Sequence, residues 1–335
     1  MNAKTQELLD QIVADKMALQ MKMLWEADSN AMASLSAFLF ASAGKRADID
    51  RYVECKKYFK KHVNVFSEMR GIAEVIVITK MCLSHDYEEY LSGVTTVYKK
   101  LRSIHKLSAS PYMVLTAINI YEGGGIERAD ENIEKLENVY KEMKSDHFWL
   151  TGGEDRPFIA MLVSRNIDFA AISTEISACY EASKKMSFSK ETMHTTSQIM
   201  ALSAKSVEIK VADLKEMMDS LKRHKLVGMK YQLMPTAAAL GLIKGTPDEK
   251  GAEIKEIYNY LKKQKSFKWY IGGMKRSLYS MLAYAIENLD EEQTTLNSVI
   301  STTLTNIIIE EIILFIIISS SVNSARSSSS SSSTN

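Results

Sequence analysis

Four side chains in one short stretch have the chemistry of an acid–base or cation site. The stretch HFWLTGGEDRP covers residues 147–157 and holds His147, Glu154, Asp155 and Arg156. An imidazole, two carboxylates and a guanidinium within ten residues can move protons or, through the carboxylates, bind a cation. These four residues are therefore the candidate catalytic set.

The same stretch also has the composition of a connection between two helices. Pro157 suits the first turn of a helix, and Asp155 just before it can cap free N–H groups. Loss of such a cap costs about 1 kcal/mol. Gly152 and Gly153 supply backbone freedom where the preceding helix ends, and Trp149 can fill a gap between helices. This structural interpretation explains every residue type except Glu154 and Arg156, whose side chains it treats as solvated.

A second copy of the stretch supports the structural interpretation. WLTGGEDRPFIAMLV (149–163) aligns with WYIGGMKRSLYSMLA (269–283), which pairs Trp149 with Trp269, Gly152 and Gly153 with Gly272 and Gly273, and Arg156 with Arg276. Residues 133–141 and 105–112 align with 254–262 and 224–231 at almost the same offset. A duplicated connection between helices keeps the residues that shape it, whereas its surface residues change. Here Met274–Lys275 of the second copy correspond to Glu154–Asp155 of the first. A site that evolved in one copy alone would leave the same pattern, so the catalytic alternative stays open.

Short apolar segments alternate with longer amphipathic ones along the chain. The apolar segments are 34–44, 71–83, 111–121, 157–167, 195–204, 232–243 and 277–286. The longer segments carry apolar residues at helical spacing on one face, as Ile133, Leu136, Val139, Tyr140 and Met143 do. The pattern predicts about seven helical hairpins of roughly 40 residues, which must stack to bury their apolar helices. We expect an all-α, right-handed α-α superhelix, open or closed into an α/α toroid, with a 120-residue duplication relating about 70–168 to 193–288.

Composition narrows the class of protein. The 335 residues include 4 Pro and 14 Gly, and this scarcity of helix breakers favours a nearly all-helical chain. The net charge of +1 gives no reason to expect nucleic acid. Cys55, Cys82 and Cys179 are odd in number and far apart in sequence, which indicates neither a disulfide framework nor a zinc site. No metal or cofactor motif is present, and the start of the chain does not resemble a signal peptide, so we expect a cytoplasmic protein.

The chain changes character after the last repeat. Residues 1–290 form the expected helical-repeat domain, 291–318 an apolar helix or tail, and 319–335 a disordered serine-rich end. The apolar run 307–318 is shorter than the roughly 20 residues that a membrane-spanning helix needs, so no transmembrane span is expected. We expect the run to dock on the last hairpin, to drive self-association, or to attach to a membrane surface.

The chain resembles an uncharacterised family of Firmicutes proteins catalogued as a domain of unknown function. The likeness covers most of residues 30–290 and rests on AFLFASAGKRADIDRYVECKKYFKKH, SPYMVLTAINIY, FWLTGGEDRPFIAMLV and YEASKKMSFSKETMHTTSQIMALS. Arg156 stands where the family has an aromatic residue, and the isoleucine-rich tail replaces one rich in Ala and Gln. The resemblance implies a helical protein of the bacterial cytosol and implies no activity.

Three hypotheses for function follow. The first is a non-enzymatic helical-repeat scaffold that binds a protein or peptide on a concave face. The second is an enzyme or small-ligand binder that uses a toroid interior, with Glu154 and Asp155 in an acidic loop and Tyr112 and Tyr231 at related positions. The third is peripheral membrane association through the tail.

Overall fold

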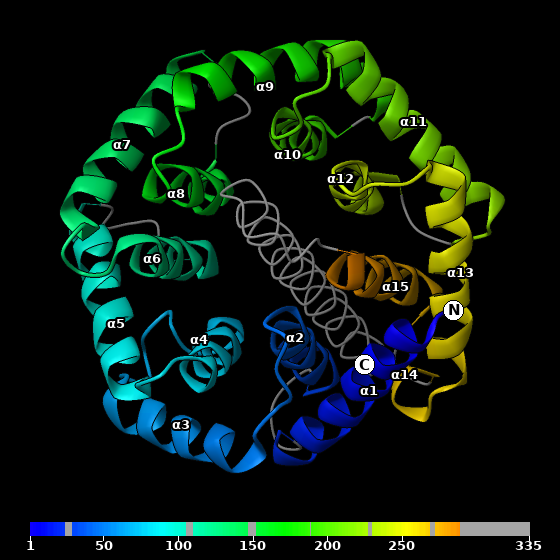
Figure 1. Ribbon diagram of the computed structural model, residues 1–335. Coiled ribbons are helices and arrows are strands. Elements are labelled where there is room, and N and C mark those ends of the chain that lie inside the picture. The colour runs from blue at the N-terminus through cyan, green and yellow to red at the C-terminus, as the bar shows by residue number, and fades with distance from the viewer. Residues whose placement is uncertain are drawn as a thin grey trace, which may run out of the picture.

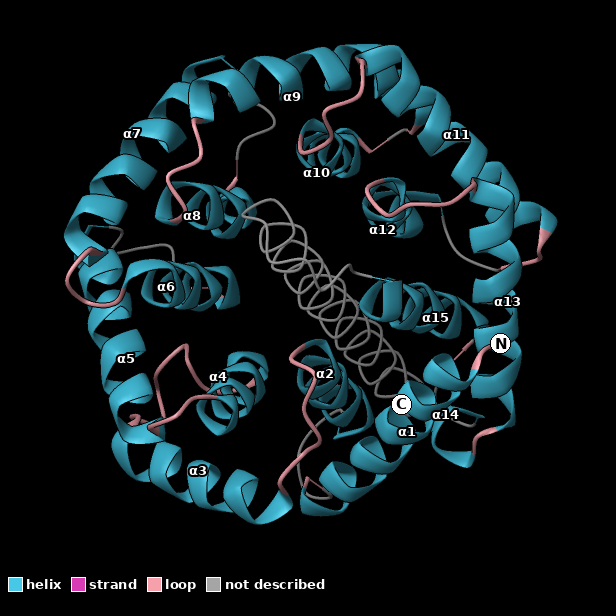
Figure 2. Cartoon of the chain, viewed as in Figure 1, coloured by secondary structure: helices cyan, strands magenta, loops and turns pink. Residues whose placement is uncertain are grey.

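The described part of the chain is entirely helical. The computed structural model describes residues 1–23, 29–104, 110–146, 152–187, 189–226, 230–268 and 272–288. Within these ranges there are fifteen α-helices, two short 3-10 turns and no strand (Figure 2). The all-helical prediction is confirmed.

Alternate helices form an outer layer, seen as the rim of Figure 1. The outer helices are α1 (Ala3–Lys22), α3 (Ile49–His62), α5 (Tyr87–Ile104), α7 (Ala129–Asp146), α9 (Phe169–Ser183), α11 (Val207–Arg223) and α13 (Pro247–Lys263). Each buries one stripe of side chains: in α3, Tyr52, Cys55 and Phe59 are buried while the lysines between them face outward. This is the pattern of an amphipathic helix with one wet face.

The helices between them form an inner layer (Figure 1). The inner helices are α2 (Ser29–Ser42), α4 (Ile72–Leu83), α6 (Pro111–Gly124), α8 (Arg156–Ser164), α10 (Lys190–Ala201), α12 (Lys230–Gly241) and α15 (Gly273–Asn288). The short helix α14 (Lys265–Lys268) precedes α15. Each of the seven apolar segments of the sequence falls within one inner helix or extends only a few residues past its end. In α2, all eleven residues from Ala31 to Ala41 are buried.

The first and last described helices meet, so that the two layers run full circle in Figure 1. Helix α1 contacts α2 on one side and α14 and α15 on the other. The side chain of Asn2 caps α1 and donates 3.0 Å to Glu287 of α15, and the Thr5 hydroxyl donates 2.6 Å to the same carboxylate. Tyr260 of α13 donates to Asp10. Helix α1 was not predicted from the sequence, although Leu9, Ile12 and Leu19 form its buried face.

Two buried lysines fasten helix ends between the layers. Lys16 of α1 donates 2.8 Å to the carbonyl of Ser266 in α14, and Lys250 of α13 donates 2.7 and 2.6 Å to the carbonyls of Leu240 and Ile243 at the end of α12. Burial lowers the pKa of each lysine to about 8. A cation at a helix C-terminus also satisfies carbonyls that have no partner within the helix.

Two of the three cysteines, far apart in sequence, meet in the fold. Cys55 of α3 and Cys82 of α4 are buried free thiols that hydrogen-bond to each other. This bond lowers the pKa of Cys55 and raises that of Cys82. The pair shows that separation along the chain is a poor guide to contact within a hairpin.

Candidate functional site

Asp155 ties the start of α8 to the neighbouring inner helix. It ends the 3-10 turn η1 (Gly153–Asp155) and is only 3% exposed. Its Oδ2 accepts a hydrogen bond from the N–H of Gly152 at 2.8 Å, and its Oδ1 accepts one from Gln198 of α10 at 2.6 Å. Asp155 makes no side-chain cap to α8, contrary to our expectation. The Asp155 carboxylate bonds instead to Gly152, the residue before η1, and to Gln198 of α10, because the start of α8 is buried between neighbouring helices.

A histidine that the sequence analysis did not select lies beside Asp155. His194 of α10 is 2% exposed, and its Nε2 is 3.4 Å from Oδ1 of Asp155. Its ring meets the edge of Tyr180 with 6.4 Å between centroids. A His–Asp pair is a common acid–base arrangement, but here both side chains are buried and neither has a free face for a substrate. No short-range spacing links residues 155 and 194, so only the folded chain reveals the pair.

Glu154 and Arg156, which were expected to be solvated, are less exposed than that: Glu154 is half-buried and Arg156 is buried. Burial raises the pKa of the partly exposed Glu154, and the negative charge of Asp155 adds to the effect. Arg156 is 7% exposed and its guanidinium lies 3.8 Å from the centroid of the Tyr140 ring. Its Nε is 3.8 Å from a carboxylate oxygen of Glu137. The expectation for Arg156 was wrong because an arginine stacks on an aromatic ring more readily than its charge suggests.

Arg276 occupies the same kind of joint in the second copy. It is buried, its guanidinium lies 5.3 Å from the centroid of Tyr258, and it donates 3.0 Å to the carbonyl of Phe267. Tyr140 and Tyr258 are both the twelfth residue of their outer helices, α7 and α13. The two arginines that the sequence aligned therefore sit over equivalent tyrosines.

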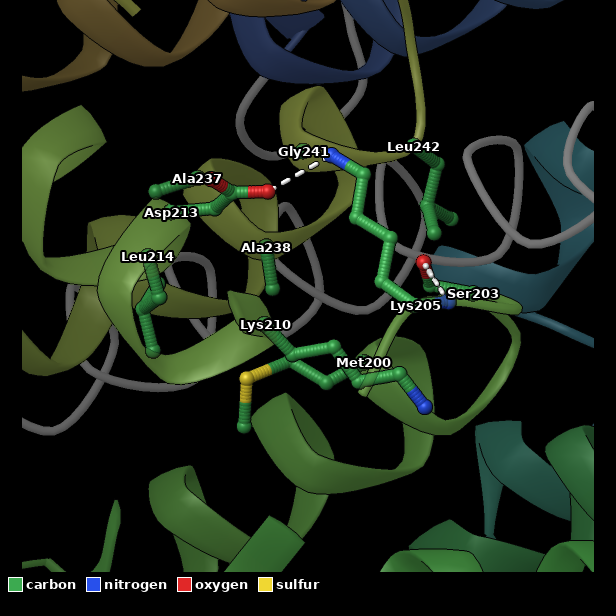
Figure 3. A pocket seen from close by; sticks show the side chains of 10 residues that line it. All are labelled: Met200, Ser203, Lys205, Lys210, Asp213, Leu214, Ala237, Ala238, Gly241 and Leu242. Atoms are coloured by element: carbon green, nitrogen blue, oxygen red, sulfur yellow. Dashed lines mark hydrogen bonds and ion pairs between the residues drawn. The ribbon is translucent and has the colours of Figure 1, made fainter. Parts of the chain in front are cut away.

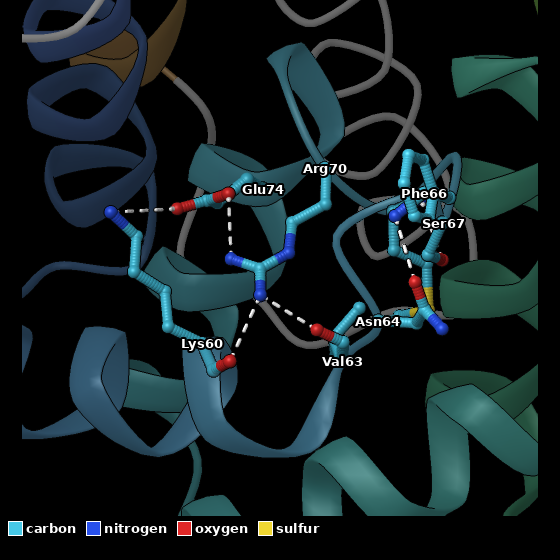
Figure 4. Close-up of polar contacts among 8 residues, drawn as sticks. Lys60, Val63, Asn64, Phe66, Ser67, Arg70 and Glu74 are labelled. Atoms are coloured by element: carbon cyan, nitrogen blue, oxygen red, sulfur yellow. Dashed lines mark hydrogen bonds and ion pairs between the residues drawn. The ribbon is translucent and has the colours of Figure 1, made fainter.

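A third arginine fills the joint between α3 and α4 (Figure 4). The Arg70 guanidinium lies 5.1 Å from the centroid of Phe59 in α3. It donates to the carbonyls of Lys60 and Val63 at 2.9 and 2.6 Å and pairs with Glu74 at 3.3 Å. Each of these three joints is closed by an arginine over an aromatic ring.

The glycines of the repeated motif do not act as expected. Gly152 has a φ of −118°, and none of Gly152, Gly153 or Gly273 is among the residues with positive φ. A left-handed backbone conformation is therefore not the reason for glycine at these positions. A Cβ on Gly152 would stand 2.2 Å from the Glu154 carboxylate, the movable end of a flexible side chain, so this contact alone does not require glycine. At Gly272 a Cβ would meet nothing within 4 Å.

Several of the sequence candidates lie outside the described residues. These are His147, Trp149, Trp269, the side chain of Tyr231 and the whole region 289–335. Tyr112 is described at the start of α6. In the ranges that the structure covers, no three His, Cys, Asp or Glu side chains are placed to hold a metal ion. No helix among the described elements has the length and apolarity needed to cross a bilayer.

A cavity of about 670 Å³ opens between the 3-10 turn η2 (Lys184–Met186), α11 and α12. We call it the lysine-rimmed groove. Its apolar lining is Met186, Met218, Leu221, Leu226, Leu233 and Met234, and its polar lining is Lys185, Lys215, Asp219, Lys222 and Lys225. The lysines and Asp219 are exposed, whereas Leu221, Leu226, Leu233 and Met234 are buried. Its volume lies within the range of ligand sites in proteins.

A second, much smaller cavity lies nearer the start of α11 and the end of α12 (Figure 3). It measures about 20 Å³, which is room for about one water molecule. Lys205 closes it with a 2.6 Å ion pair to Asp213, and the buried Lys210 pairs with Glu175. Its charges already have partners, so this cavity offers little to a ligand.

Comparison with known proteins gives a family. The model of the family described as a protein of unknown function, DUF4003, matches residues 17–315. The chain is 23% identical over 257 residues to the uncharacterised protein YeaA of Bacillus subtilis strain 168, an alignment that covers 75% of this chain and 76% of YeaA. No solved structure matches the chain. The resemblance seen in the sequence is confirmed, and the chain belongs to the DUF4003 family.

Proposed function

We propose that this chain is a non-enzymatic scaffold, a closed α/α toroid that binds an acidic peptide segment of a partner protein in the lysine-rimmed groove. The observation that carries the proposal is the groove itself, with a methionine and leucine floor under four exposed lysines. Methionine-rich floors adapt to varied apolar side chains, as on other peptide-binding surfaces. The concave face of an open superhelix, our first expectation, is replaced here by a groove between the layers.

Three features support a toroid built by duplication. The contacts between α1, α14 and α15 join the two ends of the described chain. Outer and inner helices alternate throughout, with starts about 40 residues apart. Arg156 and Arg276 stack over tyrosines at the same position of their outer helices. Stacked hairpins of this kind have no apolar helix left unpaired at an end.

The groove lies where other joints carry an arginine over a ring. Met218 is the twelfth residue of α11, the place that Tyr258 holds in α13. Leu233 lies in α12, a helix that contains no arginine. Among the described side chains, the joint between α11 and α12 thus has no arginine stacked over a ring, in keeping with its open, apolar floor.

Charge specifies the partner. Lys185, Lys215, Lys222 and Lys225 surround a single carboxylate, Asp219, so the rim is strongly positive although the whole chain carries only +1. The fitting ligand is a peptide with one or two apolar anchors flanked by Asp or Glu. Because the rim lysines are exposed, attraction is screened by salt, and binding should weaken as ionic strength rises.

The alternative of an enzyme with an interior active site has less support. Its best residues, Asp155 and His194, are buried and hydrogen-bonded or in contact with each other. For localisation we propose the cytoplasm, on the support of three free buried cysteines.

The direct experiment is selection of peptides from a displayed random library on the full-length protein. The proposal predicts enriched peptides that combine acidic residues with Leu, Met or Phe, and whose affinity falls with added salt. The paired variant Met218→Tyr with Leu233→Arg puts a tyrosine and an arginine into the floor of the groove as a plug, and this variant, with its fold checked by circular dichroism, should lose the selected peptides. Enrichment of basic or purely apolar peptides, or binding that survives the plug, would contradict the proposal.

A further inference from the structure

The connections between helices divide between the two ends of the ring. Each outer helix packs on the inner helix that follows it and is joined to it by a short connection, so the two run antiparallel. The outer helices of Figure 1 therefore share one direction along the ring axis. Their last turns, and the loops that lead to the inner helices, lie at one end of the ring. Their first turns lie at the opposite end.

Charge differs between these two ends. Six of the seven outer helices carry lysine or arginine in their last turn, and five carry aspartate or glutamate in their first. The inner helices begin where the outer ones finish, and their first turns add two carboxylates there, Glu74 and Glu191. This pattern suits the helix dipoles, and it also gathers positive charge at one end of a chain whose net charge is +1. We call it the basic end.

Exposed apolar side chains gather on one arc of the basic end. They are Met21 near the end of α1, Val65 and Phe66 in the loop after α3, and Ile104 at the end of α5. Because α3 contacts both α1 and α5, the three hairpins are neighbours in the ring. At the opposite end the exposed large apolar residues of the described chain are Met1, Ile126 and Ile209, which belong to hairpins that are not neighbours.

The fold holds Phe66 out in water. Its N–H donates 2.9 Å to Oδ1 of Asn64, which shapes the turn. Arg70 fixes the base of the same loop through its bonds to the carbonyls of Lys60 and Val63 (Figure 4). The Phe66 side chain is 92% exposed in this ordered loop. A large apolar ring kept in water gains free energy from any apolar surroundings that it can enter, so its position indicates a contact surface.

The charges around Phe66 indicate what it contacts. Lys57 and Lys61 of α3 are exposed beside the loop. Of the nearby carboxylates, Glu74 is already paired with Arg70, and Glu68 is exposed within the loop. The surroundings of the ring are therefore positive, which fits an anionic surface. A partner protein would need a pocket to receive the protruding ring, whereas the interface of a bilayer accepts an aromatic ring at any point.

We propose that this arc of the basic end docks on an anionic membrane surface. Val65 and Phe66 enter the interfacial layer of the bilayer, and Lys57 and Lys61 lie against the lipid phosphates. Met21 and Ile104 extend the apolar contact to the two neighbouring hairpins. The inference is independent of the lysine-rimmed groove, and it gives no role to residues 289–335.

The test is co-sedimentation of the full-length protein with lipid vesicles. The protein should bind vesicles of equal parts phosphatidylcholine and phosphatidylglycerol, and bind phosphatidylcholine vesicles far more weakly. Phe66→Ser should lower affinity for the anionic vesicles at least about tenfold, whereas Ile209→Ser, at an exposed apolar residue of the opposite end, should not. Circular dichroism checks that both variants fold.

A second pair of variants tests the charge. Lys61→Glu and Arg46→Glu change the net charge by the same amount, but Arg46 is exposed in the connection between α2 and α3, at the opposite end. Lys61→Glu should lower affinity at least about fivefold and Arg46→Glu by less than about twofold. Added salt should weaken the binding of the wild type, since the lysines are exposed.

Three outcomes would overturn the proposal. Equal binding by Phe66→Ser and the wild type would mean that another part of the chain holds the membrane. Equal losses for Lys61→Glu and Arg46→Glu would mean that the vesicles respond only to net charge. Absence of vesicle binding, together with a dimer that Phe66→Ser dissociates in size exclusion, would mean that this arc joins two copies of the chain.

Discussion

The guanidinium of Arg156 lies 3.8 Å from the centroid of the Tyr140 ring, in a joint from which solvent is almost excluded. The first residue of an inner helix is thereby fastened to the outer helix before it. Arg276, the fourth residue of α15, stacks over Tyr258 of α13 in a similar way. Arg156, a catalytic candidate in the sequence, thus fastens the two layers together, and a prediction about stability depends on this contact.

Arg156→Lys should destabilise the protein by about 1–2 kcal/mol, because lysine keeps the charge but loses the flat face that stacks on Tyr140. Arg276→Lys should have a similar effect. The control is Arg128→Lys, at a surface side chain 36% exposed that pairs with Glu131. It should change stability by less than about 0.5 kcal/mol. Urea unfolding followed by circular dichroism measures all three; equal midpoints for Arg156→Lys and Arg128→Lys would refute the fastening role.

Glu154→Gln should stabilise the protein at pH 7. Burial raises the pKa of Glu154 in the folded state above its unfolded value, so the folded state binds the proton more strongly. Stability contributed by this group is therefore present in acid and is lost as pH rises through the folded pKa. The advantage of Glu154→Gln over wild type should accordingly vanish below about pH 4, near the unfolded pKa of a glutamate. The exposed Glu134→Gln is the control and should show no such trend; a pH-independent difference for Glu154→Gln would count against burial as the cause.

Lys250 gives the opposite dependence on pH. Its pKa is lowered to about 8 in the folded state, while the unfolded chain keeps the ordinary value of 10.5. Between these values the unfolded state binds more protons, so stability rises with pH. Relative to Lys250→Met, wild type should gain stability between pH 8 and 10, by at most about 1.4 kcal/mol per pH unit. The exposed Lys262→Met should show no gain, and a flat difference for Lys250→Met would show that its ammonium keeps an ordinary pKa.

Gly123 tests how closely α6 and α8 approach. A Cβ at this position would stand 2.4 Å from the Cβ of Ser164, an atom that no rotamer change can move away. Gly123→Ala should therefore cost about 1–3 kcal/mol, despite alanine's better helix propensity. At Gly241, at the end of α12, a Cβ would meet nothing within 4 Å, and Gly241→Ala should be neutral or stabilising. Differential scanning calorimetry measures the two melting temperatures, and equal values for Gly123→Ala and Gly241→Ala would contradict the prediction.

Local pattern predicted much of this fold. Each inner helix contains a mostly apolar segment, as α2 does, and outer helices such as α7 show a clear stripe of apolar residues, so both could be located from the sequence alone. Arg156 could be matched to Arg276 because the two arginines occupy the same position in the repeated motif. The tyrosines on which these arginines stack could not be matched from the sequence. Tyr140 and Tyr258 pair only when the alignment of the two outer helices is shifted.

Contacts between distant residues account for what the sequence analysis missed. The His194–Asp155 contact and the Cys55–Cys82 pair join residues on different helices, and no spacing along the chain reports them. The lysine-rimmed groove was also not predicted. Lys185 is far in sequence from Lys215, Lys222 and Lys225, so only the fold brings the four lysines to one rim.

The central claim is that acidic peptides bind at the lysine-rimmed groove, and a charge reversal tests it most directly. Lys222 lines the groove and is the sixteenth residue of α11; the exposed Lys262 is the sixteenth residue of α13 and lies outside the groove lining. Fluorescence anisotropy with one selected acidic peptide would compare Lys222→Glu, Lys262→Glu and wild type at low salt. The account predicts about a tenfold or greater loss of affinity for Lys222→Glu and almost none for Lys262→Glu. Equal losses in both variants would show that the peptide responds only to net charge, and would contradict a built site.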